Sequence, residues 1–213
     1  MRSVYVARHA ERIDYFDPQW NSSAKGRSLG ADDPYISEKG HMQAAELASR
    51  LASEPIDVII SSPFHRCLET ASYAADLLNR PIYVEPGICE VLYIFPPEFK
   101  SAEDSKSKFP RIDTSYVPIL SLHHRAELSD TACMKRVAPV AKELTNRFPD
   151  KNLLMFAHGA SIAGILLGLT GRSEYVGLCT LSKLVKPDDR ELWQAEFIGC
   201  SRHLSDKSDL RAY

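Results

Sequence analysis

Asn152-Leu-Leu-Met-Phe-Ala157-His158-Gly159 is the stretch of sequence that decides the fold. Its unbroken apolar run is typical of a strand that is buried on both faces of a sheet. His158-Gly159 then forms a turn, and the small and apolar residues that follow predict a helix through Leu169. A buried strand that turns directly into a helix indicates an α/β domain.

The same order of elements recurs along the chain. Strands are predicted over 3–7, 57–60 and 81–84, with two more near 177–184 and 192–199. Helices are predicted over 38–52, from Pro63 to about Leu78, and over 127–148, where Pro139 should kink or divide the helix. This alternation predicts an α/β fold, a three-layer sandwich with a mostly parallel central sheet.

Three segments do not follow the alternation. Residues 86–126 carry several prolines and a polar run, and we interpret them as an insertion between the third and fourth strands. The polar tail from about residue 201 is expected to be frayed. The segment from Arg8 to Tyr35 is long for a connection, which is typical of a functional loop. We therefore predict one domain over residues 1–213.

Composition narrows the classes of function. The net charge of −2 argues against nucleic-acid binding through a general basic field. The sequence has neither an apolar run of about 20 residues nor a signal peptide, so we expect no membrane span and a cytoplasmic protein. Five cysteines without a C-x-x-C pair predict reduced thiols, with no zinc site and no disulfide framework.

Chemically capable residues follow four of the predicted strands. Arg8 and His9 end the first strand, and Arg66 follows the second. Glu90 follows the third strand, and His158 ends the fourth. Because ligands of open α/β sheets bind outside the carboxyl ends of the strands, these five residues should meet at one edge of the sheet.

Arginines in this set predict a phosphate site. Arg8 and Arg66 are placed to bind the phosphoryl oxygens with their planar guanidinium groups, and Arg12 is a third candidate. The helix N-termini after Pro63 and His158 would add amide donors.

The two histidines predict covalent chemistry. His9 can accept a phosphoryl group on one ring nitrogen if a hydrogen bond orients the other, and a carbonyl near Gly26 or Gly159 is a candidate acceptor. His158 could hold the transferring group as an imidazolium.

A carboxylic acid is needed to protonate the leaving oxygen and then to activate water. Glu90 is our candidate for this acid, with Glu11 and Glu85 as rivals.

Three motifs in this order resemble those of a known family. Val6-Ala-Arg8-His9-Ala10-Glu11-Arg12, the segment Ser61–Thr70 and the segment Phe156–Ser161 resemble the signatures of the histidine phosphatase superfamily, which includes the phosphoglycerate mutases. The resemblance spans residues 3 to about 200. It is closest to the phosphatase domain of the suppressor of T-cell receptor signalling proteins and to the ecdysteroid-phosphate phosphatases, through Arg8–Arg12, Val84–Gly87, Pro96–Glu98 and Asp113–Pro118. A phosphatase-like subunit of a fungal transcription factor is a more distant relative.

The resemblance implies roles for the residues of the site. His9 would be the phosphorylated residue, and Arg8, Arg66 and His158 would complete the phosphate pocket. Glu90 would be the proton donor. Arg12, Ala10 (in place of the usual glycine) and Gly159 would bind substrate. The family requires no metal and no organic cofactor.

The predicted function is a metal-independent phosphatase that hydrolyses phosphomonoesters through a phosphohistidine on His9. Its partner would be a phosphorylated small molecule, such as a steroid phosphate, or a phosphotyrosine-containing protein. The alternatives are a non-catalytic phosphate-binding or scaffold domain and a phosphoglycerate mutase. Four aromatic residues could form an apolar wall of the pocket or belong to the core: Tyr15, Phe16, Trp20 and Tyr93. The sequence leaves open whether the chain forms a homodimer.

Overall fold

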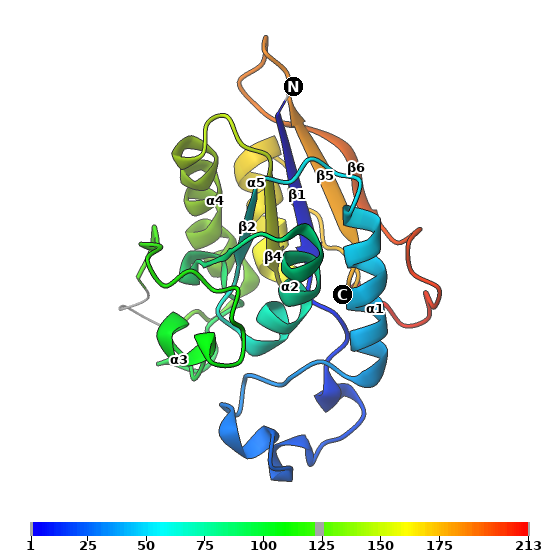
Figure 1. Ribbon diagram of the computed structural model, residues 1–213. Coiled ribbons are helices and arrows are strands. Elements are labelled where there is room, and N and C mark those ends of the chain that lie inside the picture. Colours follow the sequence, from blue (N-terminus) through cyan, green and yellow to red (C-terminus); the bar gives the residue numbers. More distant parts are fainter. Residues whose placement is uncertain (1, 122–125, 213) are drawn as a thin grey trace.

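The computed structural model describes residues 2–121 and 126–212. A six-stranded sheet with the order β3-β2-β4-β1-β5-β6 forms its centre (Figure 1). The pairs β3–β2, β2–β4 and β4–β1 are parallel, whereas β5 and β6 add an antiparallel edge. The strands are β1 (Arg2–Arg8), β2 (Val58–Ser61), β3 (Ile82–Val84), β4 (Leu153–Ala157), β5 (Leu181–Lys186) and β6 (Gln194–Cys200).

Two helical layers cover the sheet (Figure 1). Helices α1 (Glu38–Leu51) and α2 (His65–Leu78) share one apolar cluster with Tyr5 and Phe156, and α4 (Asp130–Arg147) and α5 (Gly159–Thr170) share the other with Val6 and Met155. Successive residues of a strand face opposite sides of the sheet, so one strand supplies both clusters. The mostly parallel three-layer sandwich predicted from the sequence is confirmed.

Helix boundaries follow local chemistry. Ser37 caps α1, since its hydroxyl accepts a hydrogen bond from the Gly40 N–H at 3.0 Å. Helix α2 begins at His65, two residues after the Pro63 that was expected at its first turn. The expected strand start near 177 was wrong, because Cys179 has a left-handed φ of 53° that keeps 177–180 in a turn before β5.

Helix α4 runs unbroken through Pro139 from Asp130, so the proline does not divide it. The packing of α5 against α4 is close at this point. A Cβ added to Gly168 would lie 2.5 Å from the carbonyl oxygen of Ala138. Tertiary packing of this kind stabilises a helix against the loss of one internal hydrogen bond.

The segment between β3 and α4 is anchored to the sheet in its described part. The Ile82 N–H donates to the Arg111 carbonyl at 2.8 Å, and the Asp113 N–H donates to the Ile82 carbonyl at 3.0 Å. The segment also contains the short helices η4 (Pro86–Ile88) and α3 (Ala102–Lys106). Residues 122–125 of the expected insertion lie outside the described residues.

The tail after β6 packs against the body, contrary to the expectation that it would fray. Leu204 is buried, and the carbonyl of Leu210 accepts a hydrogen bond from the Leu178 N–H at 2.6 Å. Lys39 on α1 forms an ion pair with Asp206 at 2.7 Å. The two leucines anchor a segment that is otherwise polar, and they bring its end to the carboxyl edge of the sheet.

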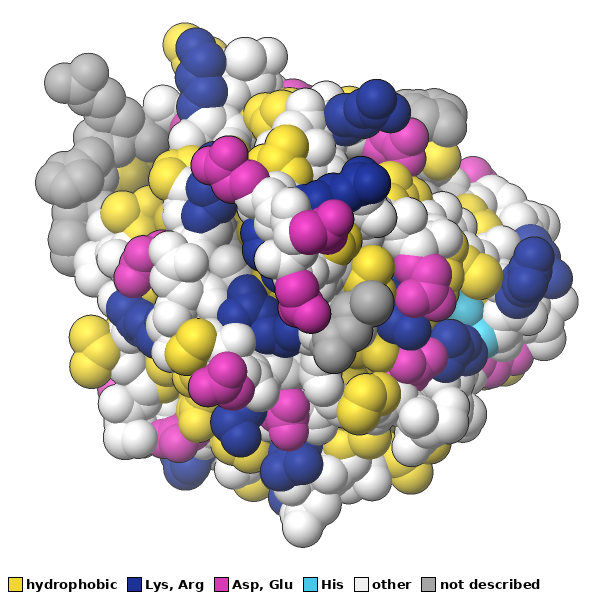
Figure 2. Space-filling model, turned by 90° about the horizontal axis from the view of Figure 1, so that it is seen from above, with side chains coloured by type: hydrophobic (Ala, Val, Ile, Leu, Met, Phe, Trp, Pro, Cys, Tyr) yellow, Lys and Arg dark blue, Asp and Glu magenta, His cyan; other side chains and the backbone are white. Residues whose placement is uncertain are grey.

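The opposite end of the molecule, from which β1 starts, shows interspersed acidic and basic side chains (Figure 2). Within 2–121 and 126–212, no helix has the length and the apolar character that a membrane crossing needs.

Candidate active site

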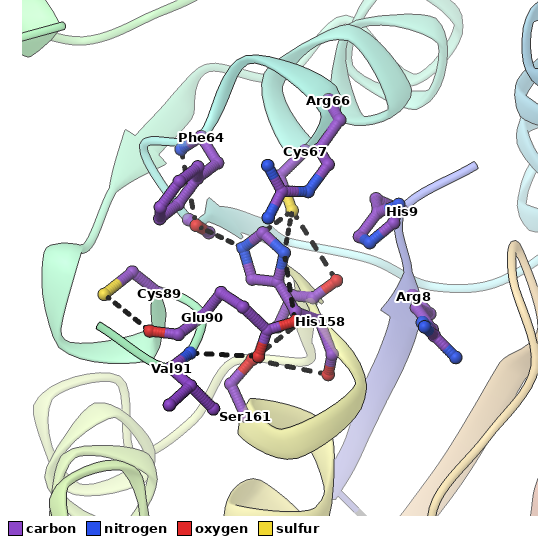
Figure 3. Close-up of polar contacts among 12 residues, drawn as sticks. Arg8, His9, Phe64, Arg66, Cys67, Cys89, Glu90, Val91, His158 and Ser161 are labelled. Atoms are coloured by element: carbon purple, nitrogen blue, oxygen red, sulfur yellow. Dashed lines mark hydrogen bonds and ion pairs between the residues drawn. The ribbon is translucent and has the colours of Figure 1, made fainter. Parts of the chain in front are cut away.

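A cavity of about 460 Å³ lies at the carboxyl edge of the parallel strands. Elements that are distant in the sequence each bring one polar side chain to this edge: Arg8 at the end of β1, Arg66 in the first turn of α2, Glu90 after β3, and His158 before α5. The rings of His9 and His158 approach to 5.2 Å between centroids. Figure 3 shows the His158 imidazole between Arg66 and Glu90, with His9 facing it from the end of β1.

His9 is held in one orientation by its own segment. Its Nδ1 lies 2.8 Å from the carbonyl oxygen of Ala10, and its backbone N–H donates to the carbonyl of Ala157 at 3.0 Å. The expected acceptor near Gly26 or Gly159 was therefore wrong. A carbonyl only accepts, so Nδ1 carries the proton and Nε2 keeps its lone pair. Burial, followed by the charges of Arg66 and Arg8, lowers the pKa of His9 well below its usual value.

His158 is completely buried beside three polar neighbours. Its Nε2 lies 2.8 Å from the Ser62 hydroxyl and 3.4 Å from the Cys67 sulfur, and its Nδ1 lies 3.9 Å from Glu90 Oε2. Burial, followed by the charge of Arg66, lowers the pKa of His158 well below its usual value. An imidazolium at His158 therefore needs a compensating negative charge in the cavity, which a phosphoryl group supplies.

The two arginines keep unused donors. Arg8 donates through NH1 to the Val176 carbonyl at 2.8 Å, and Arg66 donates through NH1 to the Asp32 carbonyl at 3.2 Å. The Nε of each arginine is buried and has no hydrogen-bond partner in the part of the chain that the structure describes. A buried charged donor without a partner is unfavourable, and a phosphate has the acceptor oxygens to satisfy it.

Of the three further residues that the sequence predicted to bind substrate, two line the cavity and one does not. Arg12 lines the cavity, and its Nε donates to Asp14 at 2.9 Å. Gly159 also lines the cavity, and a Cβ there would lie 3.5 Å from Arg8 Cζ. Ala10 is completely buried and lies outside the cavity lining, and its N–H donates to Thr70 Oγ1 at 3.0 Å. Its φ is not positive, so the replacement of the usual glycine causes no backbone strain.

Only one of the three candidate carboxylates reaches the cavity. Glu90 lines it, accepts a hydrogen bond from the Val91 N–H at 3.0 Å and has a pKa raised by burial, although Arg66 opposes the shift. Glu11 is buried and bonded to the Ser37 hydroxyl at 2.7 Å. Glu85 is buried and accepts from Ile119 N–H at 2.7 Å, which ties the insertion to β3.

Only one of the four aromatic candidates for the pocket wall lines the cavity. Tyr93 lines the cavity, whereas Trp20 is buried against Tyr35 and Tyr15 lies beneath the Arg12 guanidinium at 4.9 Å. Phe16 does not line the cavity either.

Sequence reasoning missed several residues that line the cavity or contact its polar groups: Ser62, Phe64, Thr70, Asp32, Asp33, Asp130 and Tyr175. The first three lie inside the motif 61–70, so its resemblance to the family signature could have identified them as residues of the site. The other four come from separate loops and the start of α4, and nothing in their local sequence marks them.

Over 2–121 and 126–212, no group of three or more His, Cys, Asp and Glu side chains is arranged to hold a metal ion.

The chain matches the Histidine phosphatase superfamily (branch 1) over residues 4–177, and it therefore belongs to this superfamily. Among solved structures, the ecdysone phosphate phosphatase of Bombyx mori in complex with tungstate superposes with a TM-score of 0.76 at 21% identity, covering 98% of this chain and 96% of that one. This likeness establishes a shared fold.

Two curated relatives match a part of the chain. The transcription factor tau 55 kDa subunit of Saccharomyces cerevisiae is 38% identical over 93 residues, which are 42% of this chain and 21% of that protein. Phosphoserine phosphatase 1 of Hydrogenobacter thermophilus is 38% identical over 91 residues, which are 43% of this chain and 39% of that protein. The chain thus aligns with well under two thirds of either relative.

Proposed function

We propose that this protein hydrolyses phosphate monoesters, with His9 as the nucleophile, and that it does so without a metal ion. The observation that carries the proposal is the pair of facing imidazoles, 5.2 Å apart between centroids, flanked by Arg8 and Arg66, whose buried Nε donors have no partner among the described residues. The relative named as a phosphoserine phosphatase, and the structural neighbour that was solved with the oxyanion tungstate, support a phosphatase. Phosphotyrosine and small-molecule phosphate esters are both candidate substrates.

In the first step, the lone pair on His9 Nε2 attacks phosphorus and the bond from phosphorus to the ester oxygen breaks. Arg8, Arg66 and Arg12 offset the charge on the phosphoryl oxygens, and Gly159 leaves room for the group beside Arg8. The proton of Glu90, which its raised pKa retains, passes to the leaving oxygen.

In the second step, water attacks the phosphorus of phosphohistidine and gives a proton to the Glu90 carboxylate. The bond from phosphorus to His9 Nε2 breaks, and inorganic phosphate leaves. His158 stays close to the transferring group, where a negative phosphoryl charge stabilises its imidazolium form. The Nδ1–H bond from His9 to Ala10 keeps the ring in place through both steps.

One alternative has an observation in its favour, and a second shares the proposed chemistry. A non-catalytic phosphate-binding role is favoured by the relative that is a transcription factor subunit. A phosphoglycerate mutase would use the same histidine chemistry, and interconversion of 2- and 3-phosphoglycerate would identify it. The first alternative predicts oxyanion binding without turnover.

The test is hydrolysis of 4-nitrophenyl phosphate in excess EDTA by the wild type, by His9→Ala and by the control His41→Ala. His41 lies on α1, outside the cavity lining. The proposal expects activity in the wild type and the control and a loss of at least about 10³-fold in His9→Ala. Acid-labile phosphate trapped on the wild type identifies phosphohistidine. Wild-type inactivity with retained vanadate binding would favour the binding domain.

We further propose that residues 1–213 act as one domain in the cytoplasm. The tail and the insertion both pack against the sheet, which supports a single unit. All five cysteines are free thiols, four of them buried, as suits a reducing compartment.

A further inference from the structure

The mouth of the cavity is framed by two tyrosines and one carboxylate. Tyr93 comes from the loop after β3, Tyr175 from the loop after α5, and Asp130 is the first residue of α4. The Tyr93 hydroxyl donates to Asp130 Oδ1 at 3.4 Å, and the Tyr175 hydroxyl donates to Asp130 Oδ2 at 2.5 Å. Asp130 thus joins two rings from different loops, and we name these three residues the aromatic rim.

The rim presents ring surface to solvent and to the cavity. Tyr93 is 64% exposed and Tyr175 is 38% exposed, and the adjacent Ile94 is 45% exposed. Apolar side chains gathered at the mouth of a cavity are typical of a surface that a ligand covers. The alcohol part of an ester must occupy this place when its phosphoryl group contacts Arg8 and Arg66.

The charges of the cavity separate into two zones. Its floor carries Arg8, Arg12 and Arg66 together with the carboxyl groups of Asp32 and Glu90, so arginines outnumber carboxyl groups there. The Asp130 carboxylate lies at the mouth, where it joins the exposed Tyr93 and Tyr175. Burial and the Asp130 hydrogen bond raise the pKa of Tyr175 to about 12, so its hydroxyl remains a donor at neutral pH. A phosphate is attracted to the floor, while a second negative group on the alcohol would face Asp130.

We propose that the aromatic rim selects phosphate monoesters of flat, aromatic alcohols that are neutral or cationic, and that it disfavours esters whose alcohol carries a second negative charge. This inference rests on the proposed phosphatase function. The rings of Tyr93 and Tyr175 would pack against the aromatic alcohol, and Asp130 would attract a cationic substituent and repel an anionic one. Phosphotyrosine-like and phenolic esters fit this description, whereas phosphoglycerates do not.

Three aryl phosphates test the charge preference. They are 4-(2-aminoethyl)phenyl phosphate, 4-propylphenyl phosphate and 3-(4-phosphonooxyphenyl)propionate, which are cationic, neutral and anionic at the far end. Their phenols are similar leaving groups, so the chemical step is matched. At low ionic strength we expect kcat/KM to fall in that order, with about a fivefold difference between the cationic and the anionic ester, mainly through KM.

Asp130→Asn should bring the three kcat/KM values to within about twofold of one another. Any effect of the substitution on Glu90 cancels, since the ratio compares esters of matched chemistry. The control Asp188→Asn removes an exposed carboxylate in the turn between β5 and β6 and should keep the wild-type order. An unchanged order in Asp130→Asn, or an anionic ester that is the best wild-type substrate, would overturn the inference.

The ring contact has its own test. Tyr93→Ala and Tyr175→Ala should lower the ratio of kcat/KM for 4-propylphenyl phosphate to that for ethyl phosphate by about threefold to tenfold. Tyr93→Phe and Tyr175→Phe keep the rings and should keep most of the ratio. An unchanged ratio in both alanine variants would contradict ring packing. If the wild type hydrolyses every ester with the same kcat/KM, the inference about the aromatic rim is wrong but the proposed phosphatase function is supported. If the wild type hydrolyses none of the esters, both proposals are wrong.

Discussion

Asp33 Oδ1 lies 3.7 Å from Arg66 NH1, and both side chains are almost completely buried beneath the cavity. Asp33 also accepts a hydrogen bond from the His65 N–H at 2.7 Å, at the first turn of α2. Burial raises the pKa of Asp33 to about 7, although Arg66 and the His65 N–H oppose this shift. A carboxyl group from the long loop therefore holds the cavity arginine from behind, and its charge changes near neutral pH.

Asp33→Asn should change how stability depends on pH. The folded wild type keeps the Asp33 proton up to about pH 7, whereas the unfolded chain loses it near the ordinary value of 3.8. The folded state thus binds more protons in this window, and its free energy of unfolding falls as pH rises. Asparagine keeps a side-chain oxygen that can accept the His65 N–H, and it has no proton to lose as pH rises. Between pH 5 and 7 the variant should gain at most about 3 kcal/mol relative to the wild type.

Urea unfolding at pH 5 and pH 7 measures this difference. The control Asp188→Asn should differ from the wild type by the same free energy of unfolding at both pH values. A relative stability of Asp33→Asn that decreases with pH would instead mean that the ionised Asp33–Arg66 pair is net stabilising.

The sequence predicted the parts of the site that follow directly from strand ends. Arg8, His9, Arg66 and His158 each stand next to a strand whose apolar run marks it, so the topology of a parallel sheet brings them together. Asp33 could not be predicted in this way. It lies in a loop without regular period, and its contact with Arg66 depends on how residues 13–35 fold back onto α2.

Thr70→Val should destabilise the fold, because it removes the hydrogen-bond acceptor of the buried Ala10 N–H. Thr70 Oγ1 accepts the Ala10 N–H at 3.0 Å and donates to the Arg66 carbonyl at 2.7 Å, so it links the segment after β1 to α2. Valine has a similar shape and no hydroxyl, which leaves the Ala10 N–H unpaired. We expect a loss of about 1–3 kcal/mol in the free energy of unfolding from urea titration. Thr70→Ser keeps the hydroxyl and should lose less; equal losses would refute the hydrogen-bond account.

Arg66→Lys should weaken oxyanion binding more than it weakens folding. Lysine keeps the charge, but it lacks the planar fork that can bind the Asp32 carbonyl and a phosphate together. We expect the inhibition constant for vanadate to rise by about tenfold or more. Arg111→Lys is the matched control, because Arg111 is partly exposed, lies outside the cavity lining and pairs with Asp76 at the surface. If the inhibition constant for vanadate is the same in Arg66→Lys as in the control, Arg66 does not bind the oxyanion.

The aromatic candidates show why pocket walls are harder to predict than pocket floors. Trp20 and Tyr93 look alike in sequence, since each is an aromatic residue in an irregular segment. Trp20 is buried against Tyr35, whereas Tyr93 stands in solvent at the cavity mouth. The difference is set by long-range packing of the loop, and neither hydrophobic period nor turn chemistry encodes it locally.

Glu90→Gln tests the proton donor through the leaving group. A buried carboxyl with a raised pKa keeps its proton for the leaving oxygen, and glutamine has none to give at this position. Alkoxide leaving groups need that proton most, so kcat/KM for ethyl phosphate, which reports the first step and not the hydrolysis of phosphohistidine, should fall by about 10²–10⁴-fold. With 4-nitrophenyl phosphate, whose leaving group is stable as an anion, the loss should be at least tenfold smaller. In addition, the fall in wild-type kcat/KM at high pH, where Glu90 ionises, should disappear for ethyl phosphate in the variant. Glu143→Gln on the exposed face of α4 serves as the control for removal of a carboxylate. Equal losses for both esters in Glu90→Gln would assign the proton to another group, and the Glu90 contact with His158 would then be a positioning one.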